Sequence, residues 1–170
     1  MERAYDIEDL KRLMERLRDP AYGCSWDLKQ TYQSIAPFTL EECLELIDAL
    51  EQSDYEHVEE ELGDLLFQVI FYAQLGKEEG RFDFDSVVSG ITAKLLRRHP
   101  HVFKDGELEG VIEDRTSMAA IKANWEKTKA EERAGRSQTI VMDDVTATLG
   151  ELSRAQKLKK RSATCLLYTS

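Results

Sequence analysis

Apolar side chains recur every three or four residues along most of the chain, which is the period of an amphipathic helix. The first stripe comprises Ile7, Leu10, Leu13, Met14 and Leu17. The same period predicts four further helices, over about 31–52 with a bend or restart at Pro37, about 53–75, 83–98 and 115–133. No run of alternating apolar and polar residues is long enough to predict a strand. We therefore expect an all-α helical bundle.

Short polar residues mark where these helices begin. Ser53 and Glu56 stand at the spacing of a capping box, so we expect a turn and a new helix to start at Ser53. Either Asp83 or Asp85 is expected to cap the fourth helix, which a His-Pro pair ends. The turn at Ser53 makes the second and third helices an antiparallel hairpin.

The length of 170 residues, with 42% apolar and 33% charged residues, suits one compact domain with a tail. We expect the domain over residues 1–133 and a linker with a basic helical tail over 134–170. The longest apolar stretch, residues 65–75, is shorter than the roughly 20 residues that span a bilayer, so no membrane partner is expected. The N-terminus lacks the basic and apolar regions of a secretory signal, which predicts a cytoplasmic protein.

The chain is acidic, with 33 acidic and 23 basic residues and a formal net charge of -10. Such a charge opposes attraction to the phosphate backbone, so binding to bulk nucleic acid is not expected. The three cysteines are widely spread and form no C-x-x-C pair, which argues against a disulfide framework and a structural zinc site.

Three carboxylates share one face of the second predicted helix. On a helical wheel the apolar side chains between residues 40 and 50 fill one arc, while Glu41, Glu42 and Glu45 fill the opposite arc. One interpretation is a solvated face on which Glu42 serves as the capping partner of Thr39. The other interpretation, a cation site, depends on the next helix.

Glu61 and Asp64 lie one turn apart where the third helix becomes apolar almost all round, over residues 62–73. A carboxylate beside a buried segment is unfavourable unless it is paired or binds a cation. No Lys or Arg occurs between Gln30 and Gly76, so this hairpin offers no internal salt bridge. An all-oxygen donor set suits Mg²⁺ or Mn²⁺ rather than zinc or copper. The histidines do not have the Glu-x-x-His spacing of a di-iron bundle.

Five short motifs follow one another along roughly residues 7–133. They are Gly23-Cys24-Ser25-Trp26-Asp27-x-x-Gln30-Thr31, Glu41-Glu42-x-x-Glu45, Glu61-x-x-Asp64, Lys94-Leu-Leu-Arg97-Arg98-His99-Pro100-His101-Val102-Phe103 and Asn124-Trp125-Glu126. Either carboxylate motif alone is a weak signal, but the ordered series is specific. It resembles the MazG-type nucleoside triphosphate pyrophosphohydrolases.

The resemblance implies an all-α and usually dimeric fold. It also implies an enzyme that uses Mg²⁺ to hydrolyse nucleoside triphosphates to the monophosphate and pyrophosphate. A bundle completed by homodimerisation is therefore expected. Carried onto this chain, the metal ligands are Glu42, Glu45, Glu61 and Asp64. Glu41 either orients this set or accepts a proton from the attacking water.

A cage of carboxylates repels a triphosphate, so cations must approach from elsewhere. Lys94 and Arg98, one turn apart, are the expected phosphate contacts, although cations also interact favourably with a helix C-terminus. In similar proteins a pair such as Trp125 and Lys129 contacts the nucleotide, whereas a Trp on an amphipathic helix also suits a core position. Trp26 either covers the site or packs against helix ends.

Longer family members carry a second copy of the domain after a segment like Arg154-Ala155-Gln156-Lys157. Residues 164–170 do not resemble that continuation, so we expect the first domain of a two-domain protein, truncated or ending in foreign residues. Two alternatives stay open. The chain is a catalytically weak regulatory or dimerisation domain that binds nucleotide, or it acts on a specialised nucleotide such as dUTP or a phosphoribosyl-ATP.

Overall fold

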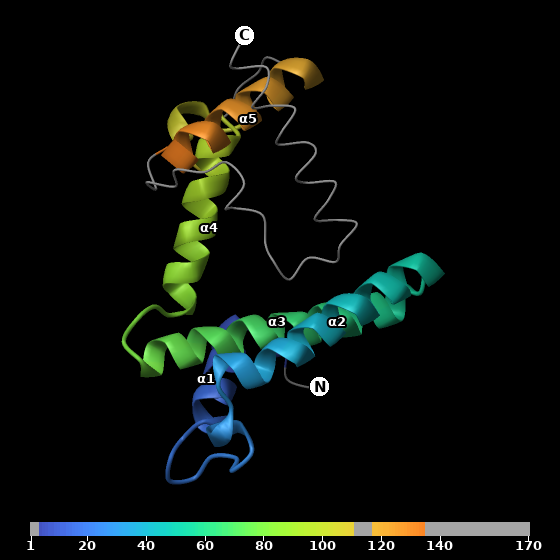
Figure 1. Cartoon of the computed structure of the whole chain (residues 1–170), viewed down its shortest axis with the longest axis vertical. Helices are drawn as coiled ribbons and strands as arrows, with labels where there is room; N and C mark the ends of the chain where they lie inside the picture. The colour runs from blue at the N-terminus through green and yellow to red at the C-terminus, as the bar shows by residue number, and fades with distance from the viewer. Residues whose placement is uncertain (1–3, 111–116, 135–170) are drawn as a thin grey trace. The chain divides into compact units, whose positions relative to one another are not determined.

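The structure, a computed structural model, describes residues 4–110 and 117–134. Within these ranges the chain forms the helices α1 (Ile7–Leu17), α2 (Tyr32–Gln52), α3 (Tyr55–Glu78), α4 (Phe84–Arg98) and α5 (Met118–Ala134). Two short 3₁₀ turns, η1 (Asp27–Lys29) and η2 (Lys104–Gly106), lie between them, and the described ranges contain no β-strand. The all-α prediction is confirmed (Figure 1).

Contacts within the chain divide it into two units, Met1–Ala93 and Lys94–Ser170. The first unit holds α1, α2, α3 and most of α4, and the second holds the end of α4 with η2 and α5. None of the described helices is long and apolar enough to cross a membrane. The division into a domain over 1–133 and a tail over 134–170 stays a prediction, and the tail beyond residue 134 lies outside the described residues.

The first two helices begin with reciprocal caps. Asp6 accepts hydrogen bonds from the backbone N–H of Glu8 and Asp9, and the Asp9 carboxylate accepts one from the Asp6 N–H at 3.3 Å. At the start of α2, Thr31 and Ser34 exchange the same pair of bonds at 2.8 and 3.2 Å. These side chains satisfy N–H groups that have no partner inside the helix, and each such cap contributes about 1 kcal/mol.

Pro37 lies inside α2, which continues from Tyr32 to Gln52. The predicted restart at Pro37 therefore does not occur. Proline removes one N–H donor, and the carbonyl that loses its partner belongs to Gln33 in the exposed first turn. Water can replace the missing bond there, so the helix tolerates the proline.

A tight turn joins α2 and α3 into an antiparallel hairpin (Figure 1). Ser53 adopts the left-handed conformation, with φ 58°, and ends α2. Asp54 caps α3 by accepting a hydrogen bond from the His57 N–H, and its carboxylate also pairs with His57 Nδ1 at 2.8 Å. The predicted capping box of Ser53 and Glu56 is wrong, because Ser53 serves as the C-cap of the preceding helix.

The core of the first unit lies where α1 and α2 pack against α3. The buried cluster comprises Met14, Ile35, Ile70, Phe71 and Leu75. The opposite side of the hairpin is open, since several large apolar side chains are about half exposed: Leu40, Leu44, Ile47, Leu50, Leu62, Leu66 and Val69. Among the described residues the third helix is thus buried mainly on one side, whereas its composition suggests burial on several sides.

Candidate metal and nucleotide site

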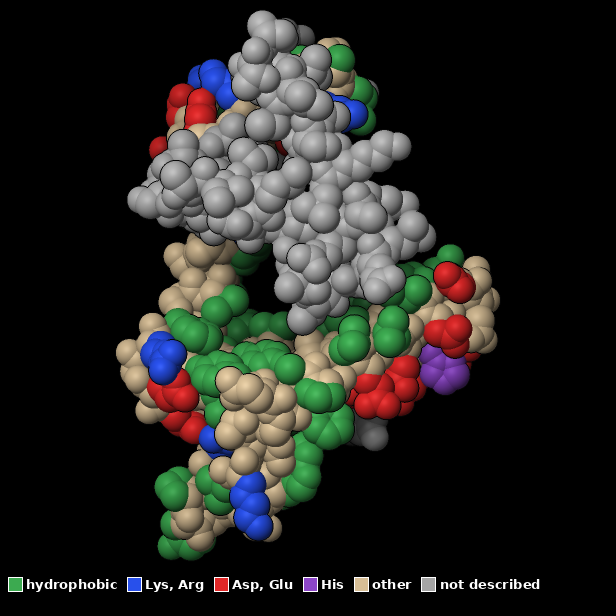
Figure 2. Space-filling view, in the orientation of Figure 1, with side chains coloured by type: hydrophobic (Ala, Val, Ile, Leu, Met, Phe, Trp, Pro, Cys, Tyr) green, Lys and Arg blue, Asp and Glu red, His purple; other side chains and the backbone are tan. Residues whose placement is uncertain are grey.

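Three predicted carboxylates converge between α2 and α3. Glu42 and Glu45 stand one helical turn apart on α2, and Glu61 faces them from α3. One carboxylate oxygen from each residue lies within 4.8 Å of those of the other two. Figure 2 shows acidic side chains gathered over this hairpin. The antiparallel pairing of the helices, set by the Ser53–Asp54 turn, thus brings together residues that are far apart in sequence.

In the part of the chain that the structure describes, no Lys or Arg forms an ion pair with the cluster of Glu42, Glu45 and Glu61. Glu42 and Glu61 are partly buried, and Glu61 Oε2 is buried without a hydrogen-bond partner in the described part of the chain. Buried carboxylate oxygens normally have a partner, so this one needs an explanation. A hard divalent cation such as Mg²⁺ takes oxygen ligands of this kind, and the residues present therefore fit a metal.

Two members of the cluster, Glu42 and Glu61, have a pKa raised above the ordinary value. Burial is the largest cause for Glu42, followed by the charges of Asp64, Glu45 and Glu61. Burial also raises the pKa of Glu61 above its ordinary value, followed by the charges of Glu45 and Asp64. Both shifts record carboxylates that are desolvated and repel one another. A bound cation removes this repulsion.

The other two predicted residues lie beside the cluster. Asp64, one turn after Glu61, is exposed, and its charge raises the pKa of both Glu42 and Glu61. It is nevertheless not among the three residues whose oxygens lie within 4.8 Å. Glu41 is exposed and adjacent in sequence to Glu42. The structure thus groups three of the four predicted ligands and places Asp64 and Glu41 at the edge.

A polar contact that the sequence does not reveal joins α2, one turn before Glu42, to α3. The Thr39 and Tyr72 hydroxyls share a hydrogen bond of 2.9 Å, and the Thr39 hydroxyl lies 3.4 Å from the amide oxygen of the buried Gln68. Thr39 is inside α2, where its hydroxyl also lies 3.3 Å from the Ile35 carbonyl. The interpretation in which Glu42 caps Thr39 is therefore wrong, because no helix begins there.

One aromatic side chain, Phe38, lies on the same helix as two of the carboxylates and contacts a tryptophan of the preceding loop. Trp26, which is 51% exposed, meets Phe38 edge-to-face with ring centroids 6.0 Å apart. Phe38 stands four residues before Glu42, so both side chains share a face of α2. Sequence analysis missed Phe38, although its spacing from Glu42 could have identified it.

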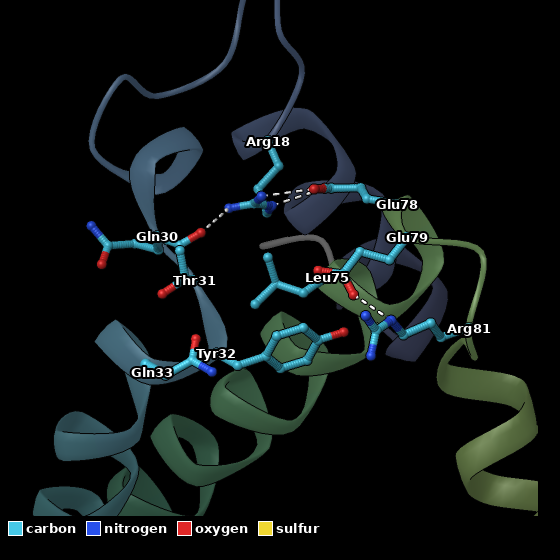
Figure 3. Close-up of a pocket in the computed structure, with 9 residues that line it drawn as sticks. All are labelled: Arg18, Gln30, Thr31, Tyr32, Gln33, Leu75, Glu78, Glu79 and Arg81. Atoms are coloured by element: carbon cyan, nitrogen blue, oxygen red, sulfur yellow. Dashed lines mark hydrogen bonds and ion pairs between the residues drawn. The ribbon is translucent and has the colours of Figure 1, made fainter.

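A pocket of about 380 Å³ lies at the opposite end of the hairpin (Figure 3). It contains none of the predicted site residues, and its charges are paired as Arg18 with Glu78 and Arg81 with Glu79. Arg18 also donates to the carbonyls of Asp27 and Gln30. Arg18 therefore links the loop that carries Trp26 to the C-terminal end of α3, where Glu78 lies.

The predicted phosphate contacts belong to the second unit. Arg98 pairs with Glu132 of α5, with Nη2 2.5 Å from Oε2, and its guanidinium carbon lies 5.2 Å from the centre of the Trp125 ring. Lys94 is half-buried on the same helix. The structure thus brings together Arg98 and Trp125, two residues for which the sequence predicts a nucleotide contact.

Two further details complete this group. The His99 ring packs edge-to-face on Trp125 at 5.2 Å, and Lys129 lies in α5 with its side chain outside the described part. Glu132 was missed by sequence analysis. Two adjacent arginines signal that a counter-charge is needed, but the sequence does not say which of the many carboxylates supplies it.

Comparison with known proteins assigns the carboxylate hairpin to a family. The family model described as the MazG nucleotide pyrophosphohydrolase domain matches residues 30–103, which include the three clustered glutamates. The chain is also 50% identical over 157 residues to the nucleoside triphosphate pyrophosphohydrolase of Escherichia coli (strain K12). Residues 30–103 of this chain form a MazG domain. This family comprises metal-dependent hydrolases, and the acidic cluster of this chain suits a divalent cation.

Other MazG relatives agree with this assignment. The nucleoside triphosphate pyrophosphohydrolase/pyrophosphatase MazG of Thermotoga maritima is 37% identical over 92% of this chain. The chain covers 57% of the Escherichia coli relative and 56% of the Thermotoga maritima relative, so it spans little more than half of each. The crystal structure of a mazG-related protein from Thermotoga maritima matches 73% of this chain and 99% of its own, with a TM-score of 0.59 at 24% identity. At this identity the likeness supports the all-α fold alone.

Proposed function

We propose that the chain hydrolyses nucleoside triphosphates to the nucleoside monophosphate and pyrophosphate, with Mg²⁺ held by Glu42, Glu45, Glu61 and Asp64. The observation that carries the proposal is the cluster of three glutamate oxygens within 4.8 Å of one another. The Glu61 Oε2 atom, which is buried and has no hydrogen-bond partner among the described residues, supports a bound cation further. Mn²⁺ has the same preference for oxygen ligands and is the expected substitute.

The metal would neutralise charge on the phosphate oxygens and lower the pKa of the attacking water. Water adds to phosphorus as the bond to the pyrophosphate oxygen breaks, and a carboxylate takes the proton. Glu41, exposed beside Glu42, orients the ligands or serves as that base. Lys94 and Arg98 bind phosphate oxygens, because the acidic cluster alone repels a triphosphate.

Aromatic residues are proposed to hold the nucleoside. Trp26 is half exposed and forms a T-shaped contact with Phe38, which leaves at least one face of its ring suited to stacking on a base. Trp125 lies against Arg98, and we assign it with Lys129 to the same nucleotide. Stacking alone accepts any base, so this arrangement favours broad specificity.

A homodimer is part of the proposal. The open face of the hairpin exposes apolar side chains that include Leu44, Ile47 and Leu62, each about half exposed. A second copy of this face would cover them, as expected for a symmetric interface. The proposal also places the protein in the cytoplasm, where its substrates and Mg²⁺ are present.

Product analysis tests the proposal. The full chain is incubated with a panel of NTPs and dNTPs, with Mg²⁺ or with a chelator, and the products are identified by ³¹P NMR. Monophosphate and pyrophosphate that disappear on chelation are expected. Orthophosphate as the first product, or turnover that survives chelation, would contradict it. dUTP and phosphoribosyl-ATP in the panel identify a specialised substrate.

A second candidate is a regulatory or dimerisation domain that binds nucleotide without turnover. The observation that favours it is that the chain spans only 57% of the Escherichia coli relative, so chemistry can reside in the remainder of such a protein. Calorimetry would then detect nucleotide binding by a chain that releases no pyrophosphate.

A further inference from the structure

Glu132 is bonded to two arginines at once. Arg98 donates from Nε to Oε1 at 3.3 Å and from Nη2 to Oε2 at 2.5 Å. Arg97 donates to Oε1 from Nε at 3.0 Å and from Nη2 at 2.5 Å. The side chains of Glu132 and Arg98 are only 14% and 17% exposed, whereas that of Arg97 is 54% exposed. The pair with Arg98 is therefore the well-shielded half of this arrangement.

The guanidinium of Arg98 is restrained on two sides. Glu132 accepts hydrogen bonds from Nε and Nη2 of Arg98, and the centre of the Trp125 ring lies 5.2 Å from the guanidinium carbon. Its third nitrogen, Nη1, forms no hydrogen bond within the described part of the chain. A guanidinium can bind a planar or tetrahedral anion through either edge, and fixing one edge leaves the other oriented.

The local charge still favours an anion. Arg97 and Arg98 supply two positive charges against the single negative charge of Glu132, which leaves one net positive charge. A carboxylate shared by two arginines therefore orients Arg98 without cancelling its attraction for phosphate.

We propose that Glu132 is a positioning residue that holds Arg98 against Trp125, with the Nη1 edge directed to a phosphate of the nucleotide. This inference rests on the proposed function, in which Arg98 binds substrate. The competing arrangement is a latch, in which Glu132 occupies the place of the phosphate and must be displaced. The two arrangements predict opposite changes in affinity when the carboxylate is neutralised.

The test compares Glu132→Gln with Glu131→Gln in the full chain. Glu131 is the adjacent glutamate of α5, 64% exposed and 3.9 Å from Lys127, so its amide variant is a matched control. Two quantities are measured: the Kd for an α,β-imido nucleoside triphosphate with Mg²⁺ by calorimetry, and KM and kcat for pyrophosphate release. Helix content by circular dichroism confirms that each variant folds.

For Glu132→Gln we expect Kd and KM to rise about tenfold with kcat changed less than about twofold, because an oriented charged contact is lost. Glu131→Gln is expected to match the wild type, and Glu132→Asp to recover part of the affinity. In an Arg98→Ala background, Glu132→Gln should add less than about a further twofold, since Glu132 acts through Arg98.

Tighter binding by Glu132→Gln would overturn the proposal in favour of a latch. Unchanged affinity, or an equal loss in the Arg98→Ala background, would also overturn it, as would a wild-type chain that does not bind the analogue. A wild-type chain that binds but releases no pyrophosphate refutes the proposed function alone, and the Kd values then still decide the role of Glu132.

Discussion

Two groups of charged side chains in this protein are balanced in opposite ways. Between α2 and α3, three glutamates meet with no Lys or Arg paired to them among the described residues, and burial with mutual repulsion raises the pKa of Glu42 and Glu61. Between α4 and α5, one glutamate meets two arginines, whose hydrogen bonds lower the pKa of Glu132 to about 2. Charge that is neutralised within the chain stabilises the fold, whereas uncompensated charge indicates a ligand from outside.

The largest expected effect is the loss of enzymatic activity when the charge of Glu61 is removed. Glu61→Gln removes a proposed metal ligand, so we expect pyrophosphate release to fall by about a thousandfold or more while helix content is unchanged. Glu59→Gln, two residues earlier on the exposed surface of α3, is the control and is expected to retain activity. A Glu61→Gln chain as active as the control would contradict the assignment of the site.

Metal binding gives the next largest effect. Mg²⁺ at about 100 times its Kd is expected to stabilise the folded chain by about 2.7 kcal/mol, because it binds only the folded state. Thermal unfolding with Mg²⁺ or with a chelator measures this gain. The Glu61→Gln chain should show little of it, and a gain of equal size in that variant would place the metal elsewhere.

In metal-free protein the two groups should respond to neutralisation with opposite signs. Glu132→Gln loses charged hydrogen bonds to Arg97 and Arg98, and we expect the free energy of unfolding to fall by about 1–2 kcal/mol. Glu61→Gln relieves repulsion and should raise the melting temperature in chelator. Calorimetry measures the change in melting temperature of each variant relative to the wild type. Two changes of the same sign would contradict the contrast between the two groups.

Acid should remove the contribution of Glu132 in a defined range. Its pKa is lowered in the folded chain to about 2 from an ordinary value of 4.5, so its stabilising effect is complete above the ordinary value. The effect is lost as the pH falls through about 4.5 toward 2. We therefore expect the difference in melting temperature between wild type and Glu132→Gln to shrink over this range. A difference independent of pH would show that the ion pair is not its source.

Local patterns in the sequence predicted the helices well. The apolar stripe from Ile7 to Leu17 matches the bounds of α1, because period and caps are local properties. The turn after α2 was predicted at the correct place, but Ser53 was assigned to the wrong helix. A cap at a junction depends on backbone conformation, and the left-handed geometry of Ser53 is not encoded in residue type alone.

The candidate site was predictable only where it depends on helical spacing. Glu42, Glu45 and Glu61 could be grouped from sequence because an antiparallel hairpin brings one face of each helix together. The contact of Thr39 with Tyr72 and the pairing of Glu132 with Arg98 could not, since both join residues more than 30 positions apart. Such contacts depend on how the helices pack rather than on any local pattern.

A crystal of the full chain grown with Mn²⁺ would test the central claim most directly, because anomalous scattering locates this ion. The account predicts a peak between α2 and α3, within coordination distance of carboxylate oxygens from Glu42, Glu45 and Glu61. A fully occupied Mn²⁺ site elsewhere, with no Mn²⁺ in contact with these three carboxylates, would contradict the account.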